Sequence, residues 1–354
     1  MIDSLTPAPT PRPAIREGVS LRGKNSLGIA AKARYFIQVR STDDLLGAIE
    51  WADSQKLETL ILGGGSNLVF AGDFQGLVVQ VAVTGRRWQD IENDSAVLEL
   101  GAGEAWHDCV LYAAKAGYRG IENLALIPGT VGAAPVQNIG AYGCELADTL
   151  VNLTALDRVT GEEIRLSNEQ CRFSYRDSLF KHQPGRYVIL QVRLKLSRTR
   201  DLQLDYRDLK DYFSEHDTRQ LTPSEVVQAV MAVRRRKLPD PDQLPNVGSF
   251  FKNPVIPIAD WHSLKERHPG LAGHTEENSA KVAAAWLIDQ CGWKGYRDDR
   301  VGVHNHQALV LVNHSDGSGQ DILDLASRIR EDVQSRFGIR LEMEPGIVGA
   351  AAGL

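Results

Sequence analysis

The sequence predicts an α+β protein of two or three domains. Its 354 residues exceed the length of one ordinary domain. The hydrophobic fraction of 43% and the charged fraction of 24% are typical of globular chains and exclude wholesale disorder. Helical and alternating apolar patterns are interleaved along the chain, and several strands follow one another closely, which favours mixed sheets.

The first 120 residues predict helices separated by short strands. Ser41-x-x-Asp44 is typical of a capping box, and apolar residues at helical spacing follow it to about Lys56. A second helix begins near Trp106 and ends at Gly117. Strands are predicted at Leu57–Leu62, Leu68–Phe70 and Leu77–Val83.

The middle of the chain predicts the rest of a mixed sheet and then a domain boundary. Strands are predicted at Val151–Asp157, Glu163–Leu166 and Val188–Leu196. The apolar pattern thins over Ser197–Gln220, where we expect the boundary. Thr222-Pro223-Ser224-Glu225 supplies an N-cap, a proline at the first helical position and a glutamate at the third, so a helix begins here and should end before Pro239.

The last third of the chain predicts two helices and two strands. Val282–Cys291 is expected to be a buried helix closed by Gly292, and Val301–Val312 a single strand. A helix with one apolar face from Ile322 to Phe337 precedes a final strand at Ile339–Glu344. The expected divisions are a loose leader at 1–18, a first subdomain at 19–85, a second at 86–220 and a C-terminal domain at 221–354.

Composition excludes several classes of partner. The net charge of −5 and the pI near 6.0 give no broad attraction to nucleic acid or to an anionic membrane. The four cysteines are widely spaced and suggest neither a zinc ribbon nor a disulfide framework. No apolar run reaches the roughly 18 residues of a membrane span. We expect a cytoplasmic monomer that binds small molecules.

Two glycine-rich loops are candidate phosphate-binding segments. Gly63-Gly64-Gly65-Ser66-Asn67 follows a predicted strand, and Ile127–Pro135 continues into Gln137–Gly143. Successive N–H groups in such loops can form a nest for pyrophosphate oxygens. Neither loop matches the Rossmann fingerprint, so a dinucleotide would need another architecture. The alternative is that the glycines serve hairpin turns.

Four candidate residues are suited to bind anions or to transfer a proton. Arg176 could hold a substrate carboxylate through its fork of donors, or form a structural pair with an aspartate. Arg234 and Lys237 share a helical face and could clamp a diphosphate, although the helix dipole alone favours cations there. Ser249 lies between a glycine and two aromatic residues, where its hydroxyl could be shielded from water.

Two further pairs leave alternatives open. His304 and His306 have metal-like spacing on one side of the predicted strand, but no evident third ligand, so a structural role is favoured and no metal is expected. Glu342 and Glu344 lie two apart on the final predicted strand and should face the same side. They are either a surface pair or contribute a buried carboxylate near a reacting atom.

Seven segments together resemble the UDP-N-acetylenolpyruvoylglucosamine reductase family, flavoenzymes that complete UDP-N-acetylmuramic acid in bacterial peptidoglycan synthesis. The resemblance runs in order from about Asn25 to Gly349, and Tyr206 is similar to the tyrosine of the subclass in which a loop closes over the substrate. The segments are Gly63–Asn67, Ile127–Gly143, Tyr175–Lys181, Lys237–Pro241, Gly248–Pro254, Ala285–Gly292 and His304–Asn313.

The resemblance implies an FAD-binding core of the vanillyl-alcohol oxidase type, made of two α+β subdomains, followed by an α+β substrate-binding domain. FAD would bind non-covalently, NADPH would reduce it, and the enolpyruvyl nucleotide would then enter the same cleft. The implied FAD-binding residues are Gly63, Gly64, Gly65, Ser66, Asn67, Pro128, Gly129, Thr130, Gly132, Ala133, Gln137, Asn138, Gly140, Ala141 and Tyr142.

The resemblance also implies catalytic roles. Arg176 and Glu344 would lie at the substrate carboxylate, and Ser249 would give a proton to the enolate carbon. Glu344 must be protonated to donate a hydrogen bond, so we expect burial to raise its pKa. Because the residues after Glu344 depart from the family pattern, Glu342 stays open as the alternative.

The substrate or the nicotinamide nucleotide would be held, by the same resemblance, by Tyr206, Lys237, Asn253 and Gln307. Arg234 joins them on helix geometry alone.

Two other functions fit the sequence. The first alternative is an oxygen-using oxidase of the same fold. Such oxidases often hold the flavin covalently, but neither glycine loop contains a histidine or cysteine for that bond, which argues against this alternative. A catalytically silent nucleotide-binding module is the second alternative, and the joint presence of Arg176, Ser249 and Glu344 argues against it.

Overall fold

The computed structural model describes residues 14–349, and the first subdomain is built on a four-stranded sheet. The strand order is β1-β2-β5-β3, with β1 antiparallel to β2 and both β2 and β3 parallel to β5. The elements are β1 (Arg16–Ser20), β2 (Lys32–Val39), α1 (Thr42–Ser54), β3 (Thr59–Leu62), β4 (Leu68–Phe70) and β5 (Phe74–Val81). The predicted N-cap of α1 is confirmed, because Ser41 Oγ accepts a hydrogen bond from the Asp44 N–H at 3.1 Å. The reciprocal half of the predicted capping box is wrong, since Asp44 Oδ2 accepts the Arg40 N–H instead of the Ser41 N–H.

The second subdomain is an antiparallel five-stranded sheet covered by helices. Its strand order is β11-β10-β12-β7-β6. The elements are β6 (Arg86–Gln89), β7 (Ser95–Gly101), α2 (Trp106–Lys115), β8 (Gly140–Ala141), β9 (Cys144–Glu145), β10 (Leu150–Asp157), β11 (Glu162–Ser167), α3 (Leu179–His182), β12 (Tyr187–Ser197) and α4 (Arg207–Tyr212). Short 3₁₀ turns occupy the segment around Val131–Gln137, where the sequence predicts loops.

Helix α5 (Pro223–Lys237) packs in the core of the second subdomain. Its capping box is present, since the Glu225 N–H donates to Thr222 Oγ1 and the Thr222 N–H donates to Glu225 Oε2. Val226, Val230 and Val233 are buried in the same cluster as α2 and the sheet. The sequence divides the chain after residue 220, but this packing leads us to propose a division after Lys237.

The C-terminal domain combines two small sheets and three helices. One sheet is β13-β18-β17 and the other is β14-β16-β15. The elements are β13 (Asn246–Ser249), β14 (Val255–Pro257), α6 (Ile258–Arg267), β15 (Gly273–Thr275), β16 (Ser279–Val282), α7 (Ala284–Gln290), β17 (Val301–Val303), β18 (Val310–Asn313), α8 (Gly319–Phe337) and β19 (Gly346–Val348). The apolar face of α8 is buried as expected.

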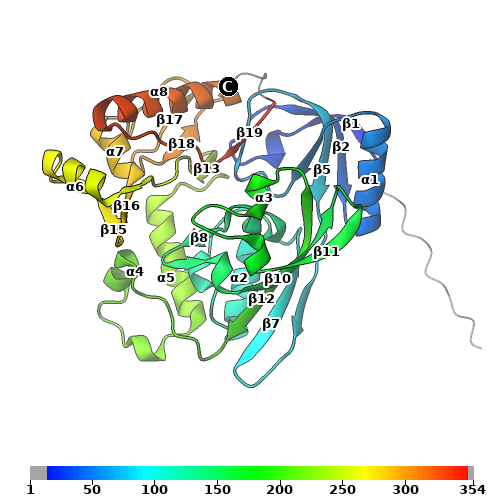
Figure 1. Cartoon of the computed structure of the whole chain (residues 1–354), viewed down its shortest axis with the longest axis horizontal. Coiled ribbons are helices and arrows are strands. Elements are labelled where there is room, and N and C mark those ends of the chain that lie inside the picture. Colours follow the sequence, from blue (N-terminus) through cyan, green and yellow to red (C-terminus); the bar gives the residue numbers. More distant parts are fainter. Residues whose placement is uncertain (1–13, 350–354) are drawn as a thin grey trace, which may run out of the picture.

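The last strand returns to the first subdomain. Figure 1 shows β19, in red, running back toward the blue sheet, where it pairs in parallel with β4. The two regions also share one core, which contains Phe36 and Phe70 from the first subdomain and Val303 and Ile322 from the C-terminal domain. The first subdomain and the C-terminal domain are therefore packed as one body, with the second subdomain beside them.

Three predictions of secondary structure are wrong in the C-terminal domain. Val301–Val312 is a hairpin of β17 and β18, because the His304 N–H donates to the Val310 carbonyl and reverses the chain. Val282 ends strand β16, so the helix begins only at Ala284. Ile339–Glu344 forms no strand beyond an isolated bridge between Met343 and Phe251.

The predicted leader at 1–18 is wrong at its C-terminal end, since Arg16 begins strand β1 and pairs with β2. Residues 1–13 lie outside the described residues. Within 14–349, no helix combines the length and apolar character that crossing a membrane requires.

Candidate active site

The two glycine-rich loops pack directly against each other. A Cβ on Gly64 would lie 2.9 Å from the Cα of Gly129, and one on Gly63 would lie 2.6 Å from Thr130 Oγ1. Ser66 Oγ donates to the Pro128 carbonyl at 3.2 Å. The loops line a groove of about 470 Å³, a size within the range of cofactor sites. A side chain in place of either glycine would push the loops apart, so this close approach requires glycine.

A second cavity continues from this groove. Ser66, Asn67, Pro128, Gln137, Ile139 and Glu344 line both spaces. The second cavity also contains Arg176, Arg234, Ser249 and Asn253. The fold therefore brings all three predicted catalytic residues, from three distant parts of the chain, to one cleft beside the glycine loops.

Arg176 is held in an unusual backbone conformation and faces Glu344. Its φ is +54°, in the left-handed region that non-glycine residues rarely adopt. Its Nη2 donates to the Gly140 carbonyl at 2.6 Å, and its Nε lies 3.6 Å from Glu344 Oε1. The guanidinium is thus fixed by the second glycine loop with one edge toward the carboxyl group.

Burial raises the pKa of Glu344 above its usual value. The cations of Arg176, Lys181 and Lys252 act in the opposite direction, but removal from water outweighs them. The side chain is only 12% exposed. The upward shift of the Glu344 pKa that the sequence predicts is confirmed. Glu344 is therefore suited to keep a proton at a pH where a surface glutamate would lose it.

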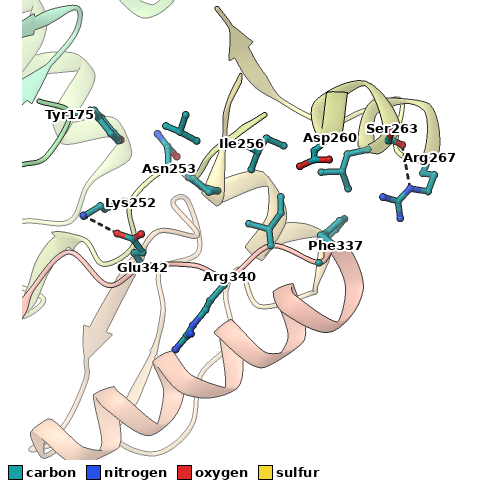
Figure 2. A pocket seen from close by; sticks show the side chains of 15 residues that line it. Tyr175, Lys252, Asn253, Ile256, Asp260, Ser263, Arg267, Phe337, Arg340 and Glu342 are labelled. Atoms are coloured by element: carbon teal, nitrogen blue, oxygen red, sulfur yellow. Dashed lines mark hydrogen bonds and ion pairs between the residues drawn. The ribbon is translucent and has the colours of Figure 1, made fainter. Parts of the chain in front are cut away.

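Glu342 does not share this environment, so the prediction that both glutamates face the same side is wrong. Figure 2 shows Glu342 in an adjoining hollow, where it pairs with Lys252 at 3.0 Å. Its side chain is 73% exposed. Tyr175 and Asn253 line both this hollow and the cleft, and Lys252 lines both the hollow and the groove. Ser249 and Arg176 do not line the hollow. The geometry therefore favours Glu344 as the functional carboxyl group.

Arg234 extends from α5 into the cleft without a protein partner. Burial lowers the pKa of its guanidinium, and within residues 14–349 that group makes no hydrogen bond or ion pair. A partly buried cation without a partner is costly unless a ligand supplies the negative charge.

Three predicted substrate residues do not line the cleft. Lys237 Nζ pairs with Asp208 Oδ2 at 2.6 Å. The ring of Tyr206 packs edge-on against Tyr142, with centroids 5.1 Å apart. Gln307 lies in the hairpin between β17 and β18, where its Oε1 accepts the Leu309 N–H at 3.3 Å.

Some of the predicted cofactor residues serve the scaffold. Asn138 is fully buried and donates to Glu145 Oε2 and to the Ser174 carbonyl. Gly132 packs against Ala102. The candidates that line neither the groove nor the cleft are Gly129, Gly132, Asn138, Ala141 and Tyr142.

Two lysines that line the groove are not predicted by the sequence analysis. Lys181 and Lys252 line it together with Glu344, and Lys181 Nζ donates to the Arg176 carbonyl at 3.1 Å. Burial and Lys252 lower the pKa of Lys181. Both residues lie in segments that resemble the family, but no spacing in the sequence joins them.

The two histidines of the His304-x-His306 pattern lie in a hairpin loop rather than on a strand, with ring centroids 5.6 Å apart. In the part of the chain that the structure describes, no three histidine, cysteine, aspartate or glutamate side chains gather as metal ligands.

Comparison with known proteins identifies the class first. A family model described as an FAD binding domain matches residues 33–167, a range that contains both glycine loops. The chain is therefore an FAD-binding oxidoreductase, and the predicted fold of the vanillyl-alcohol oxidase type is confirmed. The groove fits that cofactor, because Gly63–Asn67 lines it and the N–H groups of such a glycine loop can bind a pyrophosphate.

The comparisons then identify the family. A model described as the C-terminal domain of UDP-N-acetylenolpyruvoylglucosamine reductase matches residues 240–348. Proteins of that name from Pseudomonas fluorescens and Chromobacterium violaceum are 48% and 47% identical, each covering 94% of this chain and 98% of the relative. The chain belongs to the UDP-N-acetylenolpyruvoylglucosamine reductase family.

A solved structure agrees on the fold. The reductase of Thermus caldophilus superposes with a TM-score of 0.65 at 24% identity, over 95% of this chain and all of that one.

Replacing Gly64 by alanine should weaken FAD binding. The added Cβ meets the second loop, and overpacking of this kind costs about 1–3 kcal/mol, which corresponds to roughly 5- to 150-fold in affinity. The ratio of flavin to protein absorbance after dialysis measures the effect. Gly23→Ala is the matched control, because a Cβ there has no neighbour within 4 Å. Equal flavin retention in Gly64→Ala and the wild type would show that the loop contact is not needed.

Proposed function

We propose that the protein reduces UDP-N-acetylglucosamine enolpyruvate to UDP-N-acetylmuramate in peptidoglycan precursor synthesis, with NADPH as the reductant. The observation that carries this proposal is the convergence of Arg176, Ser249 and Glu344 on one cleft that continues the glycine-loop groove. Membership of the reductase family supports the same reaction.

The groove would hold non-covalent FAD through residues of both loops. Gly63–Asn67 would present backbone N–H groups to the pyrophosphate, and Thr130 would add a hydroxyl from the second loop. When bound, the flavin accepts a hydride from NADPH and passes it to the methylene carbon of the enolpyruvyl group. NADPH and the nucleotide substrate would use the cleft in turn, so the kinetics would be ping-pong.

Arg176 and protonated Glu344 stabilise the charge that this addition creates. Hydride arrival at the methylene carbon leaves negative charge on the adjacent carbon and on its carboxylate. The guanidinium of Arg176 offers fixed donors and a full charge, whereas Glu344 offers one neutral donor. Their separation of 3.6 Å lets both contact the same carboxylate.

Ser249 supplies the proton that completes the reduction. It lies at the end of β13, where the sheet fixes its backbone against Val310 of β18. Its hydroxyl would protonate the enolate carbon. A serine needs a nearby cation to be acidic enough, and Arg234 lines the same cleft. We assign that influence to Arg234.

The nucleotide end of the substrate would lie toward α5. Lys237 is one helical turn beyond Arg234, so the two cations can contact a diphosphate together. Tyr206 would close over the same group, as in the tyrosine-loop subclass, while Asn253 and Gln307 add polar contacts.

Anaerobic stopped-flow absorbance tests this function. NADPH should bleach the flavin band, and UDP-N-acetylglucosamine enolpyruvate should then restore it. Restoration by oxygen alone would indicate an oxidase, and a purified protein without a flavin band would indicate a silent binding module.

Ser249→Ala should leave flavin reduction by NADPH close to the wild-type rate but slow the second half-reaction. General acid catalysis is commonly worth about 10²–10⁴ in rate, so reoxidation by the enolpyruvyl nucleotide should fall by that order. The two half-reactions are followed separately by the absorbance of the oxidised flavin band. An equal loss in both would rule out a dedicated proton donor.

Glu344→Gln should change the pH dependence of the second half-reaction. Because the pKa of Glu344 is raised, the wild type keeps its donor above the usual carboxyl range and loses it as the pH rises through that raised pKa. A glutamine amide donates a hydrogen bond at every pH. The decline of the reoxidation rate at alkaline pH that is due to Glu344 should therefore disappear. Glu342→Gln is the control and should keep the wild-type profile. A decline that persists in Glu344→Gln would assign it to another group.

A further inference from the structure

Asn123 joins two segments whose rings, Tyr142 and Tyr206, contact each other beside the cleft and outside its lining. It lies in a short 3₁₀ turn at Glu122–Leu124 and is fully buried. Its Nδ2 donates to the Tyr142 carbonyl and to the Gln203 carbonyl, each at 2.8 Å. One amide therefore ties the end of the second glycine loop to the segment that leads into Tyr206.

A neutral primary amide satisfies this arrangement with one nitrogen. Both acceptors are carbonyl oxygens, so the residue between them must supply two hydrogens from one nitrogen. The amide oxygen of the same side chain destabilises the fold, because Asn123 Oδ1 is buried and accepts no hydrogen bond from residues 14–349. An apolar residue here would avoid that cost but would leave both carbonyls without a donor.

The two tied segments carry two aromatic rings that contact each other. Tyr142 has a φ of +49°, a strained conformation that the hydrogen bond to its carbonyl helps to hold. Tyr206 follows Gln203 by three residues and is 49% exposed, so burial alone does not fix its ring. The edge-on contact between the two rings therefore depends on how closely their backbones are held.

We propose that Asn123 is a positioning residue for substrate binding. By holding both backbones, it keeps Tyr206 against Tyr142 at the start of α4, whose Asp208 pairs with Lys237. The tyrosine hydroxyl is then preorganised for the diphosphate instead of being ordered at the moment of binding. This inference rests on the role given to Tyr206 in the proposed function.

Asn123→Ala should weaken binding without slowing the chemistry. Loss of two hydrogen bonds predicts an increase of about 10- to 100-fold in the KM for the enolpyruvyl nucleotide. The rate of flavin reoxidation at saturating substrate should stay within about threefold of the wild-type rate. Asn123→Ser keeps one donor and should give an intermediate KM, and it replaces Asn123→Ala if that variant does not fold.

Asn168→Ala is the matched control. Its Nδ2 also donates to two carbonyls, those of Ala147 and Leu150, but it lines neither the groove nor the cleft. If Asn123 acts only through general stability, the two alanine variants should show similar losses of melting temperature and neither should change KM selectively.

A double-mutant cycle with Tyr206 shows whether the effect passes through that ring. Tyr206→Ala combined with Asn123→Ala should bind substrate no more weakly than Tyr206→Ala alone. Additive losses would overturn the proposal, and so would an unchanged KM in Asn123→Ala. The wild type is the reference for the function itself: failure of the substrate to reoxidise its flavin would refute the proposed reaction, whatever the variants do.

Discussion

The parallel pairing of β19 with β4 is the constraint on which the active-site geometry depends. β4 directly follows the first glycine loop, so a strand paired with it brings the end of the chain to that loop. The Gly346 N–H donates to the Asn67 carbonyl at 3.0 Å, and the Glu344 N–H donates to the Phe250 carbonyl at 2.9 Å. Glu344 is therefore fixed by backbone bonds to both sides of the cleft. The position of its backbone relative to Ser249 and the glycine groove is therefore set by the fold.

Burial is the stronger electrostatic influence on Glu344, although three cations surround it. Arg176, Lys181 and Lys252 each stabilise its charged form, and the ion pair with Arg176 alone would favour ionisation. The distance of 3.6 Å from Arg176 Nε to Glu344 Oε1 is long for a charge-assisted hydrogen bond. The other nitrogens of the Arg176 guanidinium donate to the backbone carbonyls of Gly140 and Asn138. The pKa of the Glu344 carboxyl group is therefore raised despite the three cations, and Arg176 and Arg234 give the cleft positive charge for an anionic substrate.

Short-range signals explain what the sequence could predict. The caps at Ser41 and Thr222 and the apolar face of α8 each depend on residues within a few turns, and all three are confirmed. The hairpin after Val303 was missed because apolar residues continue on both sides of it, and β19 was missed because its partner lies near the other end of the chain. The same limit applies to the site: motifs pointed to Arg176, Ser249 and Glu344, but only packing separates Glu344 from Glu342 and adds Lys181 and Lys252.

The free protein holds its two candidate diphosphate cations in different ways. Lys237 is paired with Asp208, but its side chain is 46% exposed, and exposed ion pairs contribute only about 0–1 kcal/mol. A doubly charged diphosphate can therefore displace Asp208 at little cost. Arg234 is more enclosed and has no partner within residues 14–349, so the ligand would remove an existing penalty instead of breaking a bond. If the substrate binds as proposed, Arg234 should contribute more to affinity than Lys237.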